Sequence, residues 1–164
     1  MPEPETTGPD TVSVRAAALS DAAAVAELLT QLGAPGVDAT EAVRRLERNY
    51  EEVLLGCVAD APGGLVAVKT VLYFGHAKPV AHISALVVDG RFRRYGVARA
   101  LVQAAVTWAR ARHCVGLELM CGLNPAREDA HRFYPAMGFQ ADAYRYWMPL
   151  GATGATGATG AAGA

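Results

Sequence analysis

The chain has 164 residues, enough for one domain with its own core, and 52% of them are hydrophobic. Its formal net charge of −1 argues against a dedicated nucleic-acid-binding domain, since such domains usually carry a clear basic excess. No apolar run approaches the about eighteen residues that a membrane span needs. The composition therefore predicts a soluble domain without a nucleic-acid or membrane partner.

The cysteines and the two ends of the chain further limit the kind of protein and the extent of its folded domain. Cys57, Cys114 and Cys121 show no CxxC spacing and cannot all pair, so we expect no disulfide framework, no metal site and a cytoplasmic location. Residues 1–11 are acidic and proline-rich, without the pattern of a signal peptide, and residues 151–164 contain only Gly, Ala and Thr. Both ends are predicted to be disordered tails, which leaves residues 12–150 as one domain.

The first half of the domain is predicted to contain a strand, two helices and three further strands. Their expected bounds in chain order are 11–16, 20–33, 38–50, 53–59, 65–74 and 80–88. Ser20 is the expected cap of the first helix and Gly33 its end, while Asp38 and Glu41 have the spacing of a capping box. Residues 60–64 are turn-rich and predict a hairpin between the strands on either side.

The second half begins with a strongly periodic helix from Gly96 to about Arg112. A strand at 115–121, a helix at 125–137 and a final strand pair or bent strand at 139–150 follow. Antiparallel strands followed by strand, helix and strand predict an α/β fold of the mixed α+β kind. Its sheet would be mixed and mostly antiparallel, with helices on both faces.

The stretch between the strand 80–88 and this helix carries the most informative motif. Leu86-Val87-Val88-Asp89 is followed by Arg93-Arg94-Tyr95-Gly96-Val97-Ala98, so a strand turns through a glycine into a helix. Unpaired backbone amides at such a turn can bind a phosphate, and glycine allows a close approach. The local pattern also fits a tight turn with small residues for helix packing.

A second motif, Phe133-Tyr134 followed by Gly138-Phe139, lies one strand and one helix later. The two motifs together resemble the GNAT family of N-acetyltransferases, and the likeness covers about residues 12–150. It implies acetyl-CoA as the acyl donor and direct transfer of the acetyl group to an amine. The positions that the resemblance places against acetyl-CoA are Leu86, Val87, Val88, Arg93, Arg94, Tyr95, Gly96, Val97, Ala98 and Asn124. Asn124 also fits a helix cap before Pro125.

The identity of the proton acceptor is open at this point. Members of the family often carry a glutamate at the position of Ser84, and a serine is no simple base. Strand alternation places His82 on the same face as Ser84, and an imidazole suits proton transfer near neutral pH. We take His82 as the candidate base, with Glu118 and ordered water as competitors.

Tyr134 is the second candidate catalytic residue. The resemblance implies that its hydroxyl protonates the departing thiolate, whereas the helical pattern alone also fits a core aromatic. Pro135 follows directly and is expected to kink the helix at Tyr134.

The sequence therefore predicts an N-acetyltransferase that acts on a primary amine of a small molecule or peptide. The acceptor pocket is expected near residues 32–38, Tyr73, His82 and residues 144–147, and aromatic terminal strands could support a homodimer. Two alternatives stay open: an acyl-CoA-binding or sensing domain without turnover, and a partner-binding module with an empty cleft.

Overall fold

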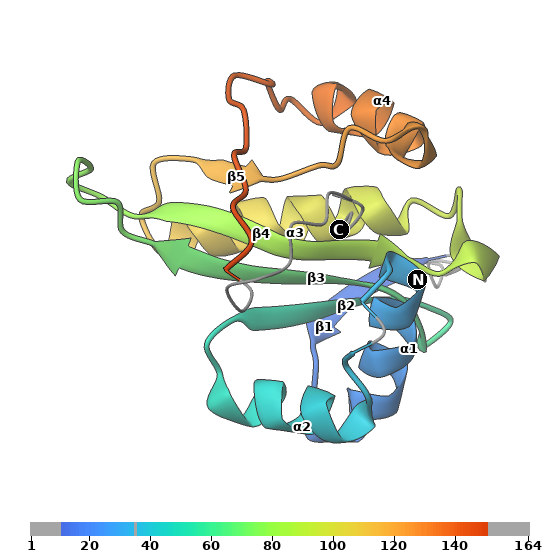
Figure 1. Cartoon of the computed structure of the whole chain (residues 1–164). Helices are drawn as coiled ribbons and strands as arrows, with labels where there is room; N and C mark the ends of the chain where they lie inside the picture. Colours follow the sequence, from blue (N-terminus) through green and yellow to red (C-terminus); the bar gives the residue numbers. More distant parts are fainter. Residues whose placement is uncertain (1–10, 35, 151–164) are drawn as a thin grey trace, which may run out of the picture. The chain divides into compact units, whose positions relative to one another are not determined.

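The computed structural model describes residues 11–34 and 36–150 (Figure 1). The predicted disordered tails, apart from Thr11, lie outside the described residues. The chain divides between Leu119 and Met120 into two units. In the described ranges, every helix is too short or too polar to cross a membrane.

The first unit contains a five-stranded sheet with the strand order β1-β2-β3-β4-β5. Neighbouring strands are antiparallel except for β4 and β5, which are parallel. Its elements are β1 (Val12–Ala16), η1 (Leu19–Asp21), α1 (Ala22–Leu32), α2 (Ala39–Arg48), β2 (Glu52–Val58), β3 (Ala61–Val71), β4 (Val80–Val88), η2 (Gly90–Phe92), α3 (Val97–Ala111) and β5 (Leu117–Leu119). The second unit contains η3 (Pro125–Arg127) and α4 (Glu128–Ala136). The predicted mixed, mostly antiparallel α/β fold is confirmed.

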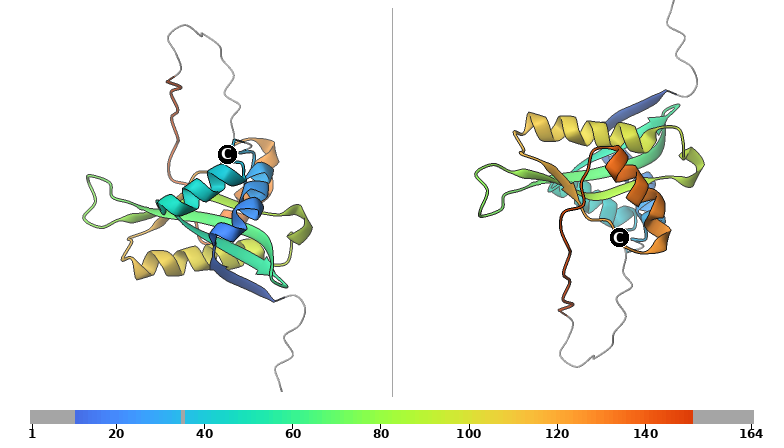
Figure 2. Two further views of the ribbon diagram at one scale, coloured as in Figure 1. Left: turned by 90° about the horizontal axis from the view of Figure 1, so that it is seen from below. Right: turned by 90° about the horizontal axis from the view of Figure 1, so that it is seen from above.

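Helices cover both faces of the sheet in the first unit (Figure 1; Figure 2). Buried residues of α1 and α2 pack with Leu55 and Leu65 on one face, and α3 packs through Val97 and Leu101 on the other. Alternate residues of β4 serve the two layers: Val87 joins the α1 and α2 side, while Leu86 and Val88 pack on the α3 side. The sheet is therefore the middle of three layers, as its apolar strands predict.

A pair of glycines brings the first turn of α3 close to the sheet. Gly56 of β2 stands opposite Gly64 of β3. A Cβ atom at either position would lie 2.8 or 2.9 Å from Cγ1 of Val97, respectively, closer than side-chain atoms normally approach. The absence of side chains here allows the start of α3 to rest on the backbone of β2 and β3.

The helix ends of the first half agree with the sequence except at Ser20. Gly33 ends α1 in the left-handed conformation (φ 100°), and the Asp38 carboxylate accepts a hydrogen bond from the Glu41 amide at 2.8 Å. Ser20, however, lies inside η1 and does not cap α1. The cap position of α1 is Asp21, whose side chain makes no capping bond to that helix. The Asp21 carboxylate instead accepts from the Ala18 amide at the start of η1 at 2.8 Å while it pairs with Arg15.

The hairpin turn is also shorter than the predicted stretch 60–64. Ala59 and Asp60 both have positive φ angles, 47° and 65°, so a two-residue turn joins β2 to β3. Residues 61–64 consequently belong to β3, with an irregularity in pairing after Gly56. At the other end β3 stops at Val71, and the Phe74 side chain is exposed rather than part of the strand.

The predicted strand pair at 139–150 is wrong, because these residues form neither helix nor strand. The exposed fractions of Tyr144, Tyr146, Trp147 and Leu150 range from 75% to 92%. A strand is stable only when its backbone pairs with a neighbouring strand, and an aromatic-rich sequence does not by itself provide that neighbour. The cation–π contact of Arg145 with Trp147 is local to this segment.

Candidate active site

The turn between β4 and α3 presents backbone amides in the way the sequence predicts. Arg94 and Gly96 have φ angles of 70° and 83°, and the Ala100 amide makes a hydrogen bond to the Gly96 carbonyl at 3.0 Å. The amides of the three residues between them therefore have no acceptor within the helix. A Cβ atom on Gly96 would find nothing within 4 Å. This helix start is open and suits an anionic group.

Exposed side chains surround this opening. Arg93, Arg94 and Tyr95 are all exposed, with 45% of the surface of Tyr95 accessible. Val97 is buried beneath them and Ala98 is partly buried. The turn therefore combines small or buried residues at the helix start with two arginines that can face a ligand in solvent.

The free edge of β4 lies directly before this turn. Pairing with β5 is confined to Ala81, His82 and Ile83. From Ser84 to Val88, the only strand that pairs with β4 in the described residues is β3. The backbone of Leu86, Val87 and Val88 is thus open to an extended ligand on one side, while their side chains pack in the core layers.

His82 belongs to a polar cluster at the opposite end of β4. Its Nδ1 lies 3.1 Å from Oε1 of Glu118, which stands opposite it on β5. The Tyr73 hydroxyl donates to the same carboxylate oxygen at 2.5 Å. The hydrogen bond to Glu118 raises the pKa of Tyr73, with smaller contributions from burial and the carboxylate charge. The structure therefore brings together His82, its competitor Glu118 and the predicted pocket residue Tyr73.

Ser84 is the extra residue of a β-bulge. Pairing passes from Ala67 with Ala85 to Val68 with Ile83, so Ser84 has no partner on β3. Its hydroxyl instead donates to Oε2 of Glu51 at 2.7 Å. His82 and Ser84 both face this polar cluster, as alternation predicts, and the bulge shifts the alternation only from Ala85 onward.

Glu51 is the site residue that the sequence did not indicate. Its other oxygen, Oε1, pairs with Nζ of Lys69 at 2.9 Å. Burial opposes ionisation of this carboxyl, but the hydrogen bonds from Lys69 and Ser84 and the nearby His82 together lower its pKa. Glu51 and Ser84 are 33 residues apart, and only the strand register shows that they meet. Glu51 is accordingly an ionised carboxylate next to the candidate base.

The second unit holds Tyr134, whose ring lies between two other aromatic rings. The ring centroids of Phe133 and Phe139 are 5.5 and 5.6 Å away, both in edge-on geometry. Burial, with a smaller contribution from Cys121, raises the pKa of Tyr134. The hydroxyl therefore stays protonated at neutral pH and is available as a proton donor.

Pro135 does not interrupt α4 at Tyr134, contrary to the sequence expectation. The helix continues to Ala136, and the Met137 amide donates to the carbonyls of Phe133 and Tyr134 at 3.1 and 3.0 Å. Pro135 lies in the last turn, where the missing amide removes a single helical hydrogen bond and the chain leaves the helix at once.

Asn124 occupies the capping position before Pro125, as one of its two interpretations predicts. Its φ and ψ angles of −72° and 153° are extended, and its carbonyl accepts from the Arg127 amide at 3.0 Å. Its side chain makes no capping hydrogen bond and is exposed.

In the described ranges, no group of three or more His, Cys, Asp or Glu side chains gathers in a way that could hold a metal ion.

Solved structures with the same fold include several acetyltransferases. An acetyltransferase from Trypanosoma brucei is 22% identical, with a TM-score of 0.70 over 85% of this chain and 100% of that chain. The ribosomal-protein-alanine N-acetyltransferase from Brucella melitensis is 23% identical, with a TM-score of 0.73 over 85% and 100% of the two chains. The glucosamine-6-phosphate N-acetyltransferase from Arabidopsis thaliana is 21% identical, with a TM-score of 0.73 over 86% and 99%.

Comparison with curated protein sequences gives no match. The sequence model of the acetyltransferase (GNAT) family, in contrast, matches residues 24–139, a range that includes the β4–α3 turn, the cluster around His82 and the Tyr134 motif. The chain belongs to the GNAT acetyltransferase family.

Proposed function

We propose that the chain transfers the acetyl group of acetyl-CoA to a primary amine of a small molecule or peptide, and that residues 12–150 form the domain responsible. Family membership supports acyl transfer from acetyl-CoA. The observation that carries the proposal is the open edge of β4 from Ser84 to Val88, which leads directly to the open start of α3.

These features fit the two parts of coenzyme A. The backbone of Leu86, Val87 and Val88 offers hydrogen-bonding groups to the amide-containing arm. The amides at the start of α3 after Gly96, among them those of Val97 and Ala98, would hold the diphosphate. The exposed side chains of Arg93, Arg94 and Tyr95 would flank it. Asn124, exposed and without a capping bond, is a further candidate for the arm. Acetyl-CoA supplies an activated acyl group when bound.

His82 is the proposed proton acceptor. Deprotonating an alkyl amine of pKa about 10.4 at neutral pH costs about 4 to 5 kcal/mol, so the reaction needs a group that takes the proton. Glu118 engages Nδ1, which leaves Nε2 of the same ring for the acceptor amine. The ionised Glu51 adds negative charge near the ring, which favours an incoming ammonium.

Tyr134 is the proposed proton donor to the departing thiolate. Its raised pKa keeps the proton on the oxygen until a base forms nearby. Phe133 and Phe139 fix the plane of the ring and thereby the direction of the hydroxyl.

The test combines binding with turnover. Coenzyme A and acetyl-CoA are titrated calorimetrically, and a panel of amines is then assayed for release of free thiol. The panel includes a peptide with an N-terminal alanine and a phosphorylated amino sugar, because two structurally similar enzymes are named for such acceptors. Amine-dependent thiol release is expected. Binding without release for any amine would indicate an acyl-CoA sensor instead, and absence of binding would contradict both.

A further inference from the structure

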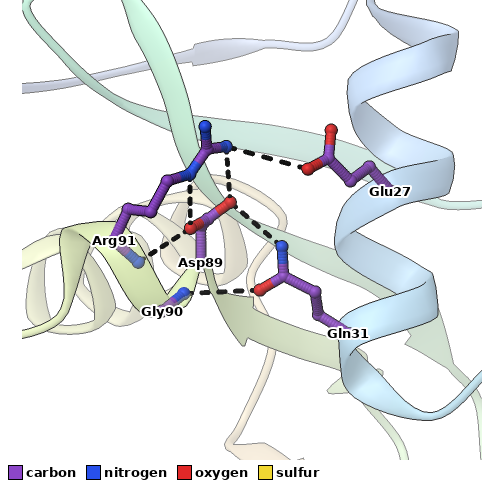
Figure 3. Close-up of polar contacts among 5 residues, drawn as sticks. All are labelled: Glu27, Gln31, Asp89, Gly90 and Arg91. Carbon is purple, nitrogen blue, oxygen red and sulfur yellow. Dashed lines mark hydrogen bonds and ion pairs between the residues drawn. The ribbon is translucent and has the colours of Figure 1, made fainter.

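The first half of the β4–α3 turn is fixed by a buried carboxylate. Asp89 follows the last residue of β4 and is only 3% exposed. Its Oδ1 accepts hydrogen bonds from the amide and Nε of Arg91, at 2.8 and 3.0 Å, and its Oδ2 accepts from Nη2 of Arg91 at 2.8 Å (Figure 3). The Gln31 side chain supplies a fourth donor, so the buried charge is fully hydrogen-bonded.

Gln31 reaches this turn from α1, 58 residues earlier in the chain. Its Nε2 donates to Oδ2 of Asp89 at 3.0 Å, and its Oε1 accepts from the Gly90 amide at 3.3 Å (Figure 3). One amide side chain therefore holds both the side chain of Asp89 and the backbone of the next residue. Glu27, one helical turn earlier, lies 3.7 Å from the Arg91 guanidinium, a looser contact between exposed side chains.

The same residues also contact β3. The Asp89 amide donates to the Gly63 carbonyl of β3 at 2.9 Å, and within the turn the Phe92 amide donates to the Asp89 carbonyl at 2.9 Å. The Phe92 ring lies so close to Gly63 that a Cβ there would come within 3.1 Å of it. Residues 89–92 are thus held between α1 and β3, and three residues, Arg93, Arg94 and Tyr95, separate them from Gly96 at the start of α3. The Tyr95 amide donates back to the Phe92 carbonyl at 3.5 Å.

From these contacts we infer that Gln31 is a positioning residue for the phosphate-binding turn, acting through Asp89 and Gly90. Gln31 does not touch the ligand. It fixes the first half of the turn, and the short connection of residues 93–95 passes that position on to the amides at the start of α3. The inference rests on the proposed binding of coenzyme A at this turn.

The test uses the full chain with Gln31→Met, which keeps the length of the side chain but removes its donor and its acceptor. Because Gln31 is exposed, this variant is expected to fold. Gln103→Met is the matched control: Gln103 is an exposed residue of α3 whose side chain has no part in the turn. Amide hydrogen exchange of residues 89–97 is followed by mass spectrometry, coenzyme A affinity by calorimetry, and kcat and KM for acetyl-CoA by thiol release.

In Gln31→Met, the amides of the turn should exchange faster and coenzyme A affinity should fall about three- to tenfold. KM for acetyl-CoA should rise in parallel while kcat at saturating donor stays near the wild-type value. Gln103→Met should match the wild type in every measurement. Unchanged exchange, or unchanged coenzyme A affinity, in Gln31→Met would overturn the inference. If the wild-type chain itself failed to bind coenzyme A, the proposed function would fall, and the exchange measurement would still decide whether Gln31 holds the turn.

Discussion

His82 is held by one contact that decides which of its ring nitrogens is free. The carboxylate of Glu118 lies against Nδ1, and Tyr73 and Glu118 are themselves hydrogen-bonded. The ring is therefore oriented by Glu118, which Tyr73 holds in turn, a recurrent arrangement for a histidine that takes up a proton. Only 15% of the His82 side chain is exposed, which keeps bulk water from competing freely for it.

We expect His82→Asn to lower kcat/KM about a hundredfold or more, because an amide cannot accept the proton of the amine. The deficit should grow as the pH falls, since a larger fraction of the acceptor is then protonated. A pH–rate profile checks this, with His113→Asn as the control at an exposed histidine after α3. Profiles of the same shape for the His82 variant and the wild type would rule out this role for His82.

Tyr134→Phe should reduce kcat while leaving the affinity for acetyl-CoA nearly unchanged. The phenyl ring preserves the contacts with Phe133 and Phe139, so only the proton donor is lost. Single-turnover kinetics together with calorimetry separate the two quantities. Tyr50→Phe, at a tyrosine that is 79% exposed, serves as the control. Wild-type turnover in Tyr134→Phe would remove the hydroxyl from the mechanism.

The residues of the polar cluster differ in how far the sequence could predict them. His82 was expected on a strand and lies on β4, and Glu118 was a competitor for the same proton. Tyr73 was also expected on a strand, but it lies beyond the end of β3 at Val71. Glu51 was not predicted, because its contact with Ser84 depends on the register of three strands and on a bulge. A local sequence pattern cannot predict a contact between two side chains that are 33 residues apart.

Among the elements, β4 and α3 were predicted closely, and together they form the proposed cofactor site. The predicted strand 80–88 has the observed bounds, and the helix differs by one residue at each end. Both elements could be predicted from their apolar residues, because these residues pack in the hydrophobic core. The turn at Ala59 and Asp60 was missed because two residues without glycine adopt the left-handed conformation.

At the level of packing, Gly64→Ala should destabilise the protein by about 1 to 3 kcal/mol. The added Cβ would lie 2.7 Å from the Val87 carbonyl oxygen and 2.9 Å from Cγ1 of Val97, so β4 or α3 must move. Urea unfolding measures the loss. Gly116→Ala is the matched control, because a Cβ there meets nothing within 4 Å. Equal stability of the two variants would show that α3 can shift without cost.

For the molecule as a whole, Asp89 connects stability to pH. The Arg91 side chain first, then the Arg91 amide and Gln31, lower the pKa of Asp89 far below its ordinary value. In an unfolded chain the pKa of an aspartate is about 3.9. The folded state is therefore favoured above about pH 4, and this contribution is lost as the pH falls toward the lower folded-state pKa.

Asp89→Asn should accordingly be less stable than the wild type at pH 7, and the difference should shrink between about pH 4 and pH 2. Free energies of unfolding in urea across this range provide the measurement. Asp60→Asn is a suitable control, because Asp60 is exposed in the hairpin turn and asparagine tolerates its φ of 65°. A gap between Asp89→Asn and the wild type that stays constant with pH would contradict the assignment of this carboxylate.

The bulge at Ser84 adds a residue to β4 without changing the face on which its neighbours lie. Ala81 and Ile83 lie in the layer under α3 together with Leu86 and Val88, so the alternation skips one position between Ile83 and Leu86. Deleting Ser84 would restore regular alternation, leaving Ile83 under α3 and His82 on the opposite face, while the hydroxyl that donates to Glu51 would be lost. We expect both the deletion variant and Ser84→Ala to keep the fold, and urea unfolding measures their stability. One surplus residue thus places a hydroxyl beside a carboxylate without disturbing the hydrophobic layers.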